Sequence, residues 1–358
     1  MLQPTGLAVL ADVGLASSVL AMGRKIHRLF GRTVPSNRII LDVRYGHLGP
    51  NYFGLAVHRA ALFNPLFDAV KQRNIPIETG LDIVACDSAG DRPTLLTSNR
   101  KRIGPFDLVI DCMGVRSPLA SLYAVTPRNE LAYGALWASL PWPKRRFDES
   151  ALEQRYENAS VMIGVLPIGY RHANDTEQTA FFWSIKPADY VAWQKAGLNA
   201  WKDRVLRLWP ETEPLLNGIT DSEQMTLARY CHHTIAKPIV GRVVAIGDSA
   251  HAASPQLGQG ANMALLDARA LSLALSHTND LDSALARYTA FRRWHVRFYQ
   301  VLSAMFTPFY QSDDRWLPVL RDFIIAPATR LPLFRTFVAR TVAGVVLDPR
   351  RKLRLHHL

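Results

Sequence analysis

The sequence is poor in cysteine, with only Cys86, Cys112 and Cys231 among its 358 residues. The number is odd and the spacing is not that of a metal site, which argues against a disulfide framework and against bound zinc. We therefore expect no metal centre. Free thiols are kept reduced in the cytoplasm, so this cysteine usage predicts a cytoplasmic protein.

Long hydrophobic runs are also lacking. No apolar segment approaches the roughly 20 residues that cross a bilayer, and the first residues lack the basic region and hydrophobic core of a signal peptide. No internal repeat and no low-complexity segment occurs. A hydrophobic content of 48% with 20% charged residues is typical of a folded protein, and the length allows one or two interleaved domains.

Acidic residues are fewer than basic ones, which gives a net charge of +12. A basic excess can indicate a nucleic acid, a membrane surface or anionic ligands as partners. The positive residues are scattered, however, and form only short runs at 144–146 and 350–352. Because no nucleic-acid-binding module accompanies them, we expect no nucleic-acid partner.

The most informative stretch of the sequence runs from residue 243 to residue 268. Four apolar residues at 243–246 predict a short buried strand. Gly247 and Asp248 then turn the chain out of the sheet and leave a carboxylate at the carboxyl end of that strand. Pro255 stiffens the loop that follows.

The second half of this stretch predicts a glycine-rich loop that leads into a helix. Gly258 and Gly260 have no Cβ and let the backbone come close to a ligand. From Ala261 on, apolar residues recur at helical spacings of three and four. Such a helix start directs free N–H groups and the positive end of the helix dipole at its ligand. A ligand with negative charge is therefore expected, with Asp248 able to accept hydrogen bonds from hydroxyl groups.

A single Gly-x-Gly is a weak motif and most often marks an ordinary corner between a strand and a helix. Here the constellation is longer: Gly-Asp-Ser-Ala-His at 247–251, Pro255, Gly-x-Gly-x-Asn at 258–262 and Asp-Ala at 267–268. It resembles the second FAD fingerprint of the aromatic-hydroxylase-like flavoprotein monooxygenases, the p-hydroxybenzoate hydroxylase type. One departure is Ala264, where that family usually has glycine.

The resemblance implies an FAD site. In that family the aspartate of the motif binds the ribityl chain of the flavin, and the helix start faces the pyrimidine end of the isoalloxazine ring. By position these roles fall on Asp248 and on 258–262. The residues that we expect to bind the cofactor are Gly247, Asp248, Pro255, Gly258, Gly260, Ala261, Asn262 and Arg59.

Arg59 matches a family arginine that contacts the phosphate or ribose region of the cofactor. It lies at the start of a predicted helix, in Val-His-Arg-Ala-Ala-Leu. A guanidinium group suits phosphate oxygens because its donors form a fork. The alternative for an isolated arginine is a solvated surface position.

The segment at 2–10, within two short helices predicted for 1–30, resembles the one that follows the first flavin motif of the family. That first motif is a βαβ unit with Gly-x-Gly-x-x-Gly, which cradles the ADP part of FAD. No such glycine array occurs in this sequence. We expect either a start that is short by roughly forty residues, the size of such a unit, or a true loss of the cradle. In both cases this chain alone is expected to bind FAD weakly.

A third motif of the family resembles the segment at 106–117, where an apolar strand ends in Asp-Cys-Met-Gly. The family has Asp-Gly-x-x-Ser at this point. Here Met113 replaces the aspartate, and the nearest acid is Asp111. We expect the strand and its loop to be kept, whereas the contacts of the family aspartate with cofactor and reductant have no counterpart at Met113.

A second group of strands is predicted between residues 125 and 235. The candidate segments, rich in β-branched and aromatic residues, are 131–140, 160–165, 179–185 and 226–233. Strands that follow one another directly predict a mostly antiparallel sheet, in contrast to the β-α alternation of the cofactor part. This sheet is expected to form the floor of a substrate cavity lined by Tyr133, Trp137, Phe181 and Trp183. The alternative for each aromatic side chain is ordinary core packing.

Outside that sheet, further strands are predicted at 75–83 and 92–97 and helices before Pro210. The segment 284–309 predicts an amphipathic helix, and prolines then separate short apolar helices up to residue 347. These C-terminal helices can cover the substrate cavity, contact the second subunit of a homodimer or touch a membrane surface weakly.

Together these patterns predict an α/β fold with interleaved parts. A Rossmann-like FAD-binding domain, incomplete at its N-terminus, is expected from 1–120 and 236–285. A mostly antiparallel substrate-binding domain is expected from 125–235, with a strand from about 36–46, and C-terminal helices are expected from 286–358.

The function that the resemblance implies is that of an FAD-dependent monooxygenase. It would use NADH or NADPH and O2 to hydroxylate or epoxidise a small aromatic or otherwise apolar substrate through a flavin C4a-hydroperoxide. Because the cofactor carries the chemical step, no catalytic side chain is assigned; the protein positions the substrate and excludes water. The alternative is a truncated, non-catalytic flavoprotein-like remnant that binds FAD weakly or not at all.

Two other chemistries are disfavoured. Asp248, Ser249 and His251 have the residue types of a hydrolase triad, but no Gly-x-Ser-x-Gly elbow occurs, and a triad joins distant parts of a chain. His232 and His233 are neighbours on a predicted strand, where adjacent side chains point to opposite faces and no third metal ligand is near.

Overall fold

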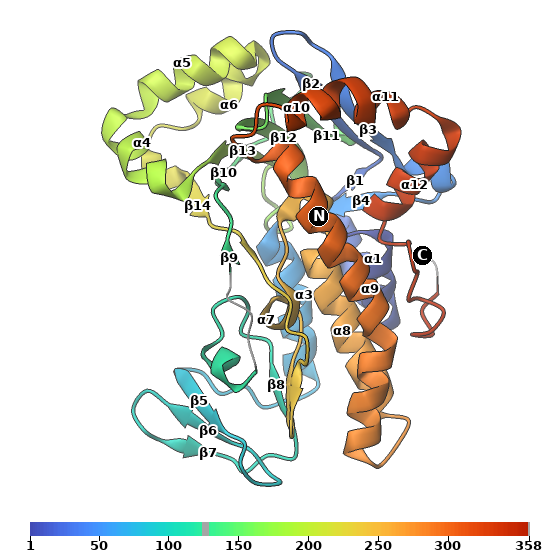
Figure 1. Ribbon diagram of the computed structural model, residues 1–358. Coiled ribbons are helices and arrows are strands. Elements are labelled where there is room, and N and C mark those ends of the chain that lie inside the picture. Colours follow the sequence, from blue (N-terminus) through green and yellow to red (C-terminus); the bar gives the residue numbers. More distant parts are fainter. Residues whose placement is uncertain (124–128, 357–358) are drawn as a thin grey trace.

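The computed structural model describes residues 1–123 and 129–356 (Figure 1). Figure 1 shows an upper region around a large sheet and a lower region with smaller sheets. The long helix α9 (Leu281–Tyr310) begins at the bottom of the lower region and reaches the large sheet at its C-terminal end.

The large sheet has seven strands in the order β14-β10-β13-β12-β11-β2-β3. Their bounds are β14 (Thr226–Ala228), β10 (Gly134–Pro141), β13 (Gln178–Ile185), β12 (Val161–Gly169), β11 (Ala151–Glu157), β2 (Arg28–Thr33) and β3 (Ile39–Arg44). All neighbouring strands are antiparallel except β11 and β2, which are parallel. The mostly antiparallel sheet that the sequence predicts is confirmed.

Two strands of this sheet differ from the sequence-based expectation. β2 begins at Arg28, within the segment 1–30 for which only helices are predicted, and continues to Thr33. β11 is not predicted at all. The buried positions of β11 are Ala151, Gln154 and Tyr156, so a polar residue interrupts the apolar pattern that would reveal a strand.

The remaining strands form smaller sheets. Two three-stranded sheets lie in the lower region: β16 (Ile239–Val240), β17 (Val243–Ala245) and β8 (Val109–Asp111), and β5 (Ile83–Asp87), β6 (Thr94–Thr97) and β7 (Arg102–Ile103). The pair β1 (Arg24–Ile26)–β4 (Gly54–Ala56) packs beside the large sheet, and a second pair is β15 (Cys231–His232)–β9 (Asn129–Glu130). β17 pairs with β8 in parallel and with β16 in antiparallel orientation, and not with the large sheet. The motif strand therefore belongs to a part of the α/β fold separate from the large antiparallel sheet.

The strand predicted at 75–83 is wrong for most of its length, since β5 begins only at Ile83. Pro76 cannot donate a ladder hydrogen bond, and the residues around it are exposed. The single strand predicted at 226–233 is divided between β14 and β15, which belong to different sheets.

Helices pack in the lower region beside β8 and β17 and cover both faces of the large sheet, whereas the sheet of β5, β6 and β7 projects at the lower left (Figure 1). In the lower region they are α1 (Pro4–Asp12), α2 (Ala16–Met22), α3 (Arg59–Gln72), α7 (Asp248–His251) and α8 (Gly260–Leu275). On one face of the large sheet they are α4 (Tyr190–Ala196), α5 (Leu198–Leu208) and α6 (Glu213–Asn217). Beyond α9 they are α10 (Leu317–Leu320), the π-helical turn η7 (Arg321–Ile325), α11 (Ala326–Ala328) and α12 (Pro332–Val342).

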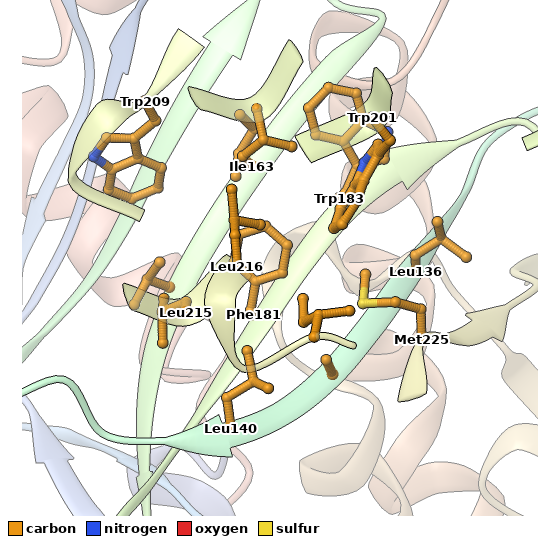
Figure 2. Packing of buried hydrophobic residues seen from close by; sticks show 14 of the residues in the cluster. Leu136, Leu140, Ile163, Phe181, Trp183, Trp201, Trp209, Leu215, Leu216 and Met225 are labelled. Atoms are coloured by element: carbon orange, nitrogen blue, oxygen red, sulfur yellow. The ribbon is translucent and has the colours of Figure 1, made fainter. Parts of the chain in front are cut away.

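The main hydrophobic core lies between the large sheet and helices α4, α5 and α6 (Figure 2). Trp201 and Trp209 from α5 and its end are buried against strand side chains such as Phe181. A second core joins β17 to α8 and α9. None of the helices in residues 1–123 and 129–356 combines the length and apolar character that crossing a bilayer requires.

Candidate active site

The motif strand β17 ends at the edge of its sheet, and the chain turns sharply there. β17 runs parallel to β8, with Ala245 opposite Asp111, so the two strands end at the same edge. Gly247 has a φ of 58°, in the region that favours glycine. The turn leaves Asp248 exposed at this edge, at the first position of the short helix α7.

Asp248 faces the N-terminus of α8. Its Oδ1 atom would lie 3.8 Å from a Cβ built on Gly260, the first residue of that helix. No side chain caps α8, so its first backbone N–H groups are available to a ligand. The positive end of the dipole of this 16-residue helix therefore lies beside a carboxylate that accepts hydrogen bonds.

An unpaired donor lies next to the same loop. The Nε2 atom of Gln3 is buried and has no hydrogen-bond partner among the described residues. A Cβ added to Gly258, which has a φ of 59°, would lie 3.4 Å from it. The site thus combines an acceptor, the carboxylate of Asp248, with two kinds of donor, the free N–H groups of α8 and the unpaired amide of Gln3. This set fits the polyhydroxyl chain and the polar ring edge of a flavin.

A buried network of ion pairs supports the turn at Gly247. The motif alone does not reveal this network. Asp267 is fully buried; its Oδ2 accepts a 2.9 Å hydrogen bond from the N–H of Gly247 and lies 2.5 Å from Nε2 of His251. Its Oδ1 accepts a 2.6 Å bond from Nε of Arg292. Burial alone would raise the pKa of Asp267, but His251 and Arg292 together hold it well below its usual range.

The network continues into the C-terminal part of the chain. Nη1 of Arg292 lies 3.2 Å from Nδ1 of His295, and Nε2 of His295 lies 3.2 Å from the carbonyl oxygen of Gly344. Burial, followed by the charge of Arg292, lowers the pKa of His295 to about 3. His295 is therefore neutral, with Nδ1 accepting from Arg292 and Nε2–H donating to Gly344.

Asp111 connects the loop of the third motif, at 112–117, to the second motif at Ser249. Its buried carboxylate accepts hydrogen bonds from Oγ of Ser117 at 2.6 Å and from the N–H of Met113 at 3.1 Å. Oγ of Ser249 lies 3.0 Å from Oδ1 of Asp111 and accepts a 2.8 Å bond from the N–H of Gly114. Asp111 thus locks two loops together, whereas Met113 is 43% exposed where the family has aspartate.

These contacts also exclude a hydrolase triad of neighbouring residues. Ser249 is held by Asp111 and Gly114, and His251 pairs with Asp267 rather than with Ser249. Asp248 is exposed at the sheet edge, whereas Ser249 and His251 are buried. Ser249 and His251 are structural supports for the loop.

Arg59, the first residue of α3, is exposed and lies near Met1 and Tyr230. Burial is the larger cause that lowers the pKa of the Met1 amino group, and the charge of Arg59 lowers it further. Burial raises the pKa of Tyr230 to about 12, against smaller opposing effects of Trp137 and Arg59. Met1 and Tyr230 both line the cavity described next, so the charge of Arg59 acts on two residues of its wall.

A cavity of about 570 Å³ lies between the large sheet and the C-terminal helices. The sheet contributes its floor, and α9, η7 and α12 contribute its cover. The motif loop at 255–258, together with Met1 and Tyr230, also lines the cavity. The loop that carries Pro255 and Gly258 therefore forms a wall of an apolar chamber.

Glycines in the strands make room for aromatic rings on the cavity floor. A Cβ at Gly164 of β12 would overlap the ring of Phe182, and one at Gly31 of β2 would lie 2.6 Å from the ring of Tyr156. The two rings therefore lie directly over the glycines. Trp137 of β10 packs on Phe182 with ring centroids 4.5 Å apart, and its Nε1 donates a 2.9 Å hydrogen bond to the hydroxyl of Tyr230.

Gln154 of β11 is the polar group between these rings. It pairs across the sheet with Gly164 on one side and Gly31 on the other, so no cross-strand side chain stands directly beside it. It is 6% exposed and lines the cavity, and its side-chain amide makes no hydrogen bond to the described residues. Its amide can both donate and accept, so a ligand in the cavity could supply the hydrogen bonds that the protein does not.

Of the four aromatic residues predicted to line the cavity, only Trp137 does so. Phe181 and Trp183 lie on the opposite face of β13, where their rings contact Trp201 at centroid distances of 6.1 and 6.2 Å (Figure 2). The reason is the alternation of side chains along a strand, which turns Phe182 toward the cavity. Tyr133 precedes β10 and donates a 2.7 Å hydrogen bond to Asp313, outside the cavity.

Comparisons with known proteins agree with this geometry. A family model described as an FAD binding domain matches residues 1–298. The 2-heptyl-3-hydroxy-4(1H)-quinolone synthase of Pseudomonas aeruginosa is 44% identical over 284 residues, which is 74% of this chain and 69% of that protein. A 3-(3-hydroxy-phenyl)propionate/3-hydroxycinnamic acid hydroxylase of Burkholderia vietnamiensis is 31% identical over 128 residues, 34% of this chain but only 23% of that protein.

The fold is shared with a solved structure. The crystal structure of Klebsiella pneumoniae HpxO complexed with FAD and uric acid superposes with a TM-score of 0.80 at 17% identity, covering 97% of this chain and 88% of that chain. The fold expected from the sequence is thereby confirmed. With the family model spanning most of the sequence and the 44% identical relative, the chain belongs to the aromatic-hydroxylase type of FAD-dependent monooxygenases.

Proposed function

We propose that this chain hydroxylates a small aromatic substrate that carries an apolar substituent, using FAD, O2 and either NADH or NADPH. The observation that carries the proposal is that the motif loop at 255–258 forms one wall of the 570 Å³ cavity. The predicted cofactor residues and the chamber thereby share a boundary. Such a volume falls within the roughly 300–1,000 Å³ of typical ligand pockets.

The residues that would hold FAD are Asp248, the backbone of 258–262 and Arg59. Asp248 would accept hydrogen bonds from ribityl hydroxyls, because it is exposed beside the start of α8. The free N–H groups of α8 would donate to the ring edge that carries negative charge during reduction. Arg59 would pair with a phosphate. Bound FAD supplies the redox chemistry, taking electrons from the nicotinamide and activating O2.

The protein would contribute positioning and the exclusion of water. The cavity walls are mostly aliphatic and aromatic, with side chains such as Met162, Phe182 and Phe306. An apolar chamber keeps water from the reacting centre, so that activated oxygen is transferred to the substrate rather than lost. Trp137 and Tyr230, linked by their hydrogen bond, would form the wall beside the motif loop.

Gln154 would orient the substrate. Its amide both donates and accepts, and it faces the cavity without a partner among the described residues. The flanking Tyr156 and Phe182 rings offer apolar surface for an aromatic ring. An aromatic substrate with a carbonyl, hydroxyl or ring N–H fits this arrangement, and its apolar substituent would extend toward the C-terminal cover.

The name of the 44% identical relative describes a quinolone with a heptyl chain, which is one molecule of this kind. We therefore infer an alkyl-substituted bicyclic aromatic as the substrate to test first. The non-catalytic alternative is not favoured, because the proteins matched over most of this chain are named as enzymes. The cytoplasmic location and the homodimer remain predictions.

The test is an oxygenation assay with a 2-alkyl-4-quinolone. Substrate should accelerate NADH or NADPH oxidation, and the product should carry one atom from labelled O2. Nicotinamide oxidation that no aromatic substrate accelerates, with no label in any product, would overturn the proposal.

Gln154→Leu refines the same test. Loss of a neutral hydrogen bond of about 1 kcal/mol should raise KM roughly fivefold and increase the fraction of nicotinamide oxidised without product. The matched control is Gln72→Leu, at an exposed position at the end of α3. If Gln154→Leu changes neither KM nor that fraction, Gln154 does not orient the substrate.

A further inference from the structure

The C-terminal helices leave large apolar side chains exposed outside the cavity that they cover. Trp316 before α10 is 79% exposed and Leu333 of α12 is 84% exposed. We call the residues of this surface the C-terminal apolar face: Trp316, Phe323, Ile324, Leu331, Leu333 and Phe334. An exposed apolar surface of this kind marks an interaction site more often than a solvated face.

This face lies at the rim of the cavity. Ile324 and Phe334 line the cavity and are nevertheless 62% and 52% exposed. The same side chains therefore contact both the chamber and the solvent. In Figure 1 the helices that carry them, α10 to α12, lie over the large sheet at the top of the molecule.

The charges around the face are mostly positive. Between residues 313 and 347 the chain has five arginines and three acids, Asp313, Asp314 and Asp322. Asp313 is paired with Lys186 at 2.8 Å, and Oδ1 of Asp314 accepts hydrogen bonds from the N–H groups of Trp316 and Leu317. Asp322 is neutralised by the buried Arg321, whose Nε lies 2.7 Å from its Oδ1. Four exposed arginines remain: Arg315, Arg330, Arg335 and Arg340. Arg38 from the β2–β3 hairpin adds a further cation, 4.2 Å from the ring centroid of Phe323.

Exposed apolar side chains among arginines suit an anionic lipid surface, which has a hydrocarbon region beneath charged head groups. Hydrocarbon accepts the apolar groups, and anionic head groups attract the arginines. A second copy of this chain is a poorer partner, because the arginines of one face would oppose those of the other. The helices are too short to cross a bilayer, so the contact would be interfacial.

We propose that the C-terminal apolar face docks on an anionic membrane surface. Trp316 and Leu333 enter the acyl chains, and Arg330 and Arg340 contact head groups. An apolar substrate dissolved in the membrane then reaches the cavity through the rim at Ile324 and Phe334; this last step rests on the function proposed above, whereas docking does not.

The experiment is sedimentation of the full chain with unilamellar vesicles. One set contains phosphatidylcholine alone, and the other contains phosphatidylglycerol mixed with phosphatidylcholine. The chain should bind the anionic vesicles and not the zwitterionic ones, and salt should weaken binding because it screens the arginines. Binding is read without substrate or nicotinamide, so its failure is distinct from a failure of the proposed reaction.

Two variants separate the apolar and the electrostatic contributions. Trp316→Ser combined with Leu333→Ser should weaken vesicle binding at least tenfold, which corresponds to about 1.4 kcal/mol. Arg330→Gln combined with Arg340→Gln should weaken it by roughly fivefold for each arginine. The control is Val191→Ser on α4, a residue that is 58% exposed on a different helix. Thermal melting checks that each variant is folded.

The proposal would be overturned if the wild-type chain did not bind anionic vesicles. It would also be overturned if the Trp316→Ser, Leu333→Ser double variant bound them as well as the wild type. A concentration-dependent dimer that Trp316→Ser and Leu333→Ser abolish, without vesicle binding, would assign the face to a second copy instead and also refute membrane docking. Selective binding to anionic vesicles that both double variants weaken would support it.

Discussion

Replacement of Asp267 by asparagine tests whether the buried network holds the cofactor turn. The change keeps the shape of the side chain but removes its charge. Arg292, whose side chain is 3% exposed, then lacks its counter-charge, and an amide nitrogen must face one of the donors on Gly247, His251 or Arg292. The network should therefore lose much more than one hydrogen bond.

The magnitude follows from the burial of both partners. Breaking a buried pair by removing one partner costs about 3–5 kcal/mol. Unfolding entropy of about 2.1 cal/mol/K per residue gives roughly 0.75 kcal/mol/K for 358 residues. Asp267→Asn should therefore lower Tm by roughly 4–7 °C.

The assay is thermal melting of Asp267→Asn beside the wild type and two further variants. Asp282→Asn, whose carboxylate is 77% exposed and lies 3.8 Å from Arg242, should change stability by less than about 0.5 kcal/mol. Asp267→Leu combined with Arg292→Met removes both charges and should recover part of the loss. If Asp267→Asn melts within about 1 °C of the wild type, the network does not stabilise the turn as we argue.

Acid titration should reveal the contribution of Asp267 to stability. Because the pKa of Asp267 is lowered in the folded state, its stabilisation is complete above about pH 4 and is lost as the pH falls through the folded-state value. The Asp267→Asn variant should lack this pH dependence. His295 has a folded-state pKa of about 3 against 6.5 for the ordinary side chain, so unfolding takes up a proton and stability falls as the pH drops from 6.5 toward 3. Between pH 7 and 5 the wild type should lose roughly 2 kcal/mol that His295→Gln does not lose; equal slopes in melting experiments would contradict this. Gly164→Ala should push the Phe182 ring into the cavity, raise KM and cost about 1–3 kcal/mol, whereas Gly90→Ala, whose methyl group would meet nothing within 4 Å, should do neither.

The parts of the site that the sequence predicts are those encoded locally. Gly247, Asp248, Gly258 and Gly260 act through backbone conformation and strand-end position, which residue type and spacing determine over a short stretch. The structure brings them to one sheet edge beside α8, as the motif indicates. Their role as ligands of FAD stays a prediction.

The parts that the sequence does not predict depend on pairing between distant segments. Asp267 and Arg292 are 25 residues apart, and nothing in either local pattern links them. Gln154 becomes notable only once β11 is known to lie between two strands with glycines opposite it. The same holds for β13, where a shift of one position separates Phe182 on the cavity floor from Phe181 in the core.

The strand β11 illustrates a related limit. A strand with one face toward a ligand cavity can place a polar residue at a buried position, and this obscures the alternation by which strands are recognised. A buried polar residue such as Gln154 therefore indicates the ligand cavity in the structure, but in the sequence it hides the strand that carries it.

The most direct test of the central claim is titration of FAD into the chain and into its Asp248→Ala variant, followed by calorimetry or fluorescence quenching. Charge-assisted hydrogen bonds contribute about 1.5–3 kcal/mol each. Whatever the affinity of the wild type, Asp248→Ala should weaken FAD binding at least roughly tenfold while Tm stays unchanged, because the side chain is exposed. Asp203→Ala, another exposed aspartate, should bind as the wild type does. Equal FAD affinity of the Asp248→Ala variant and the wild type would contradict the account.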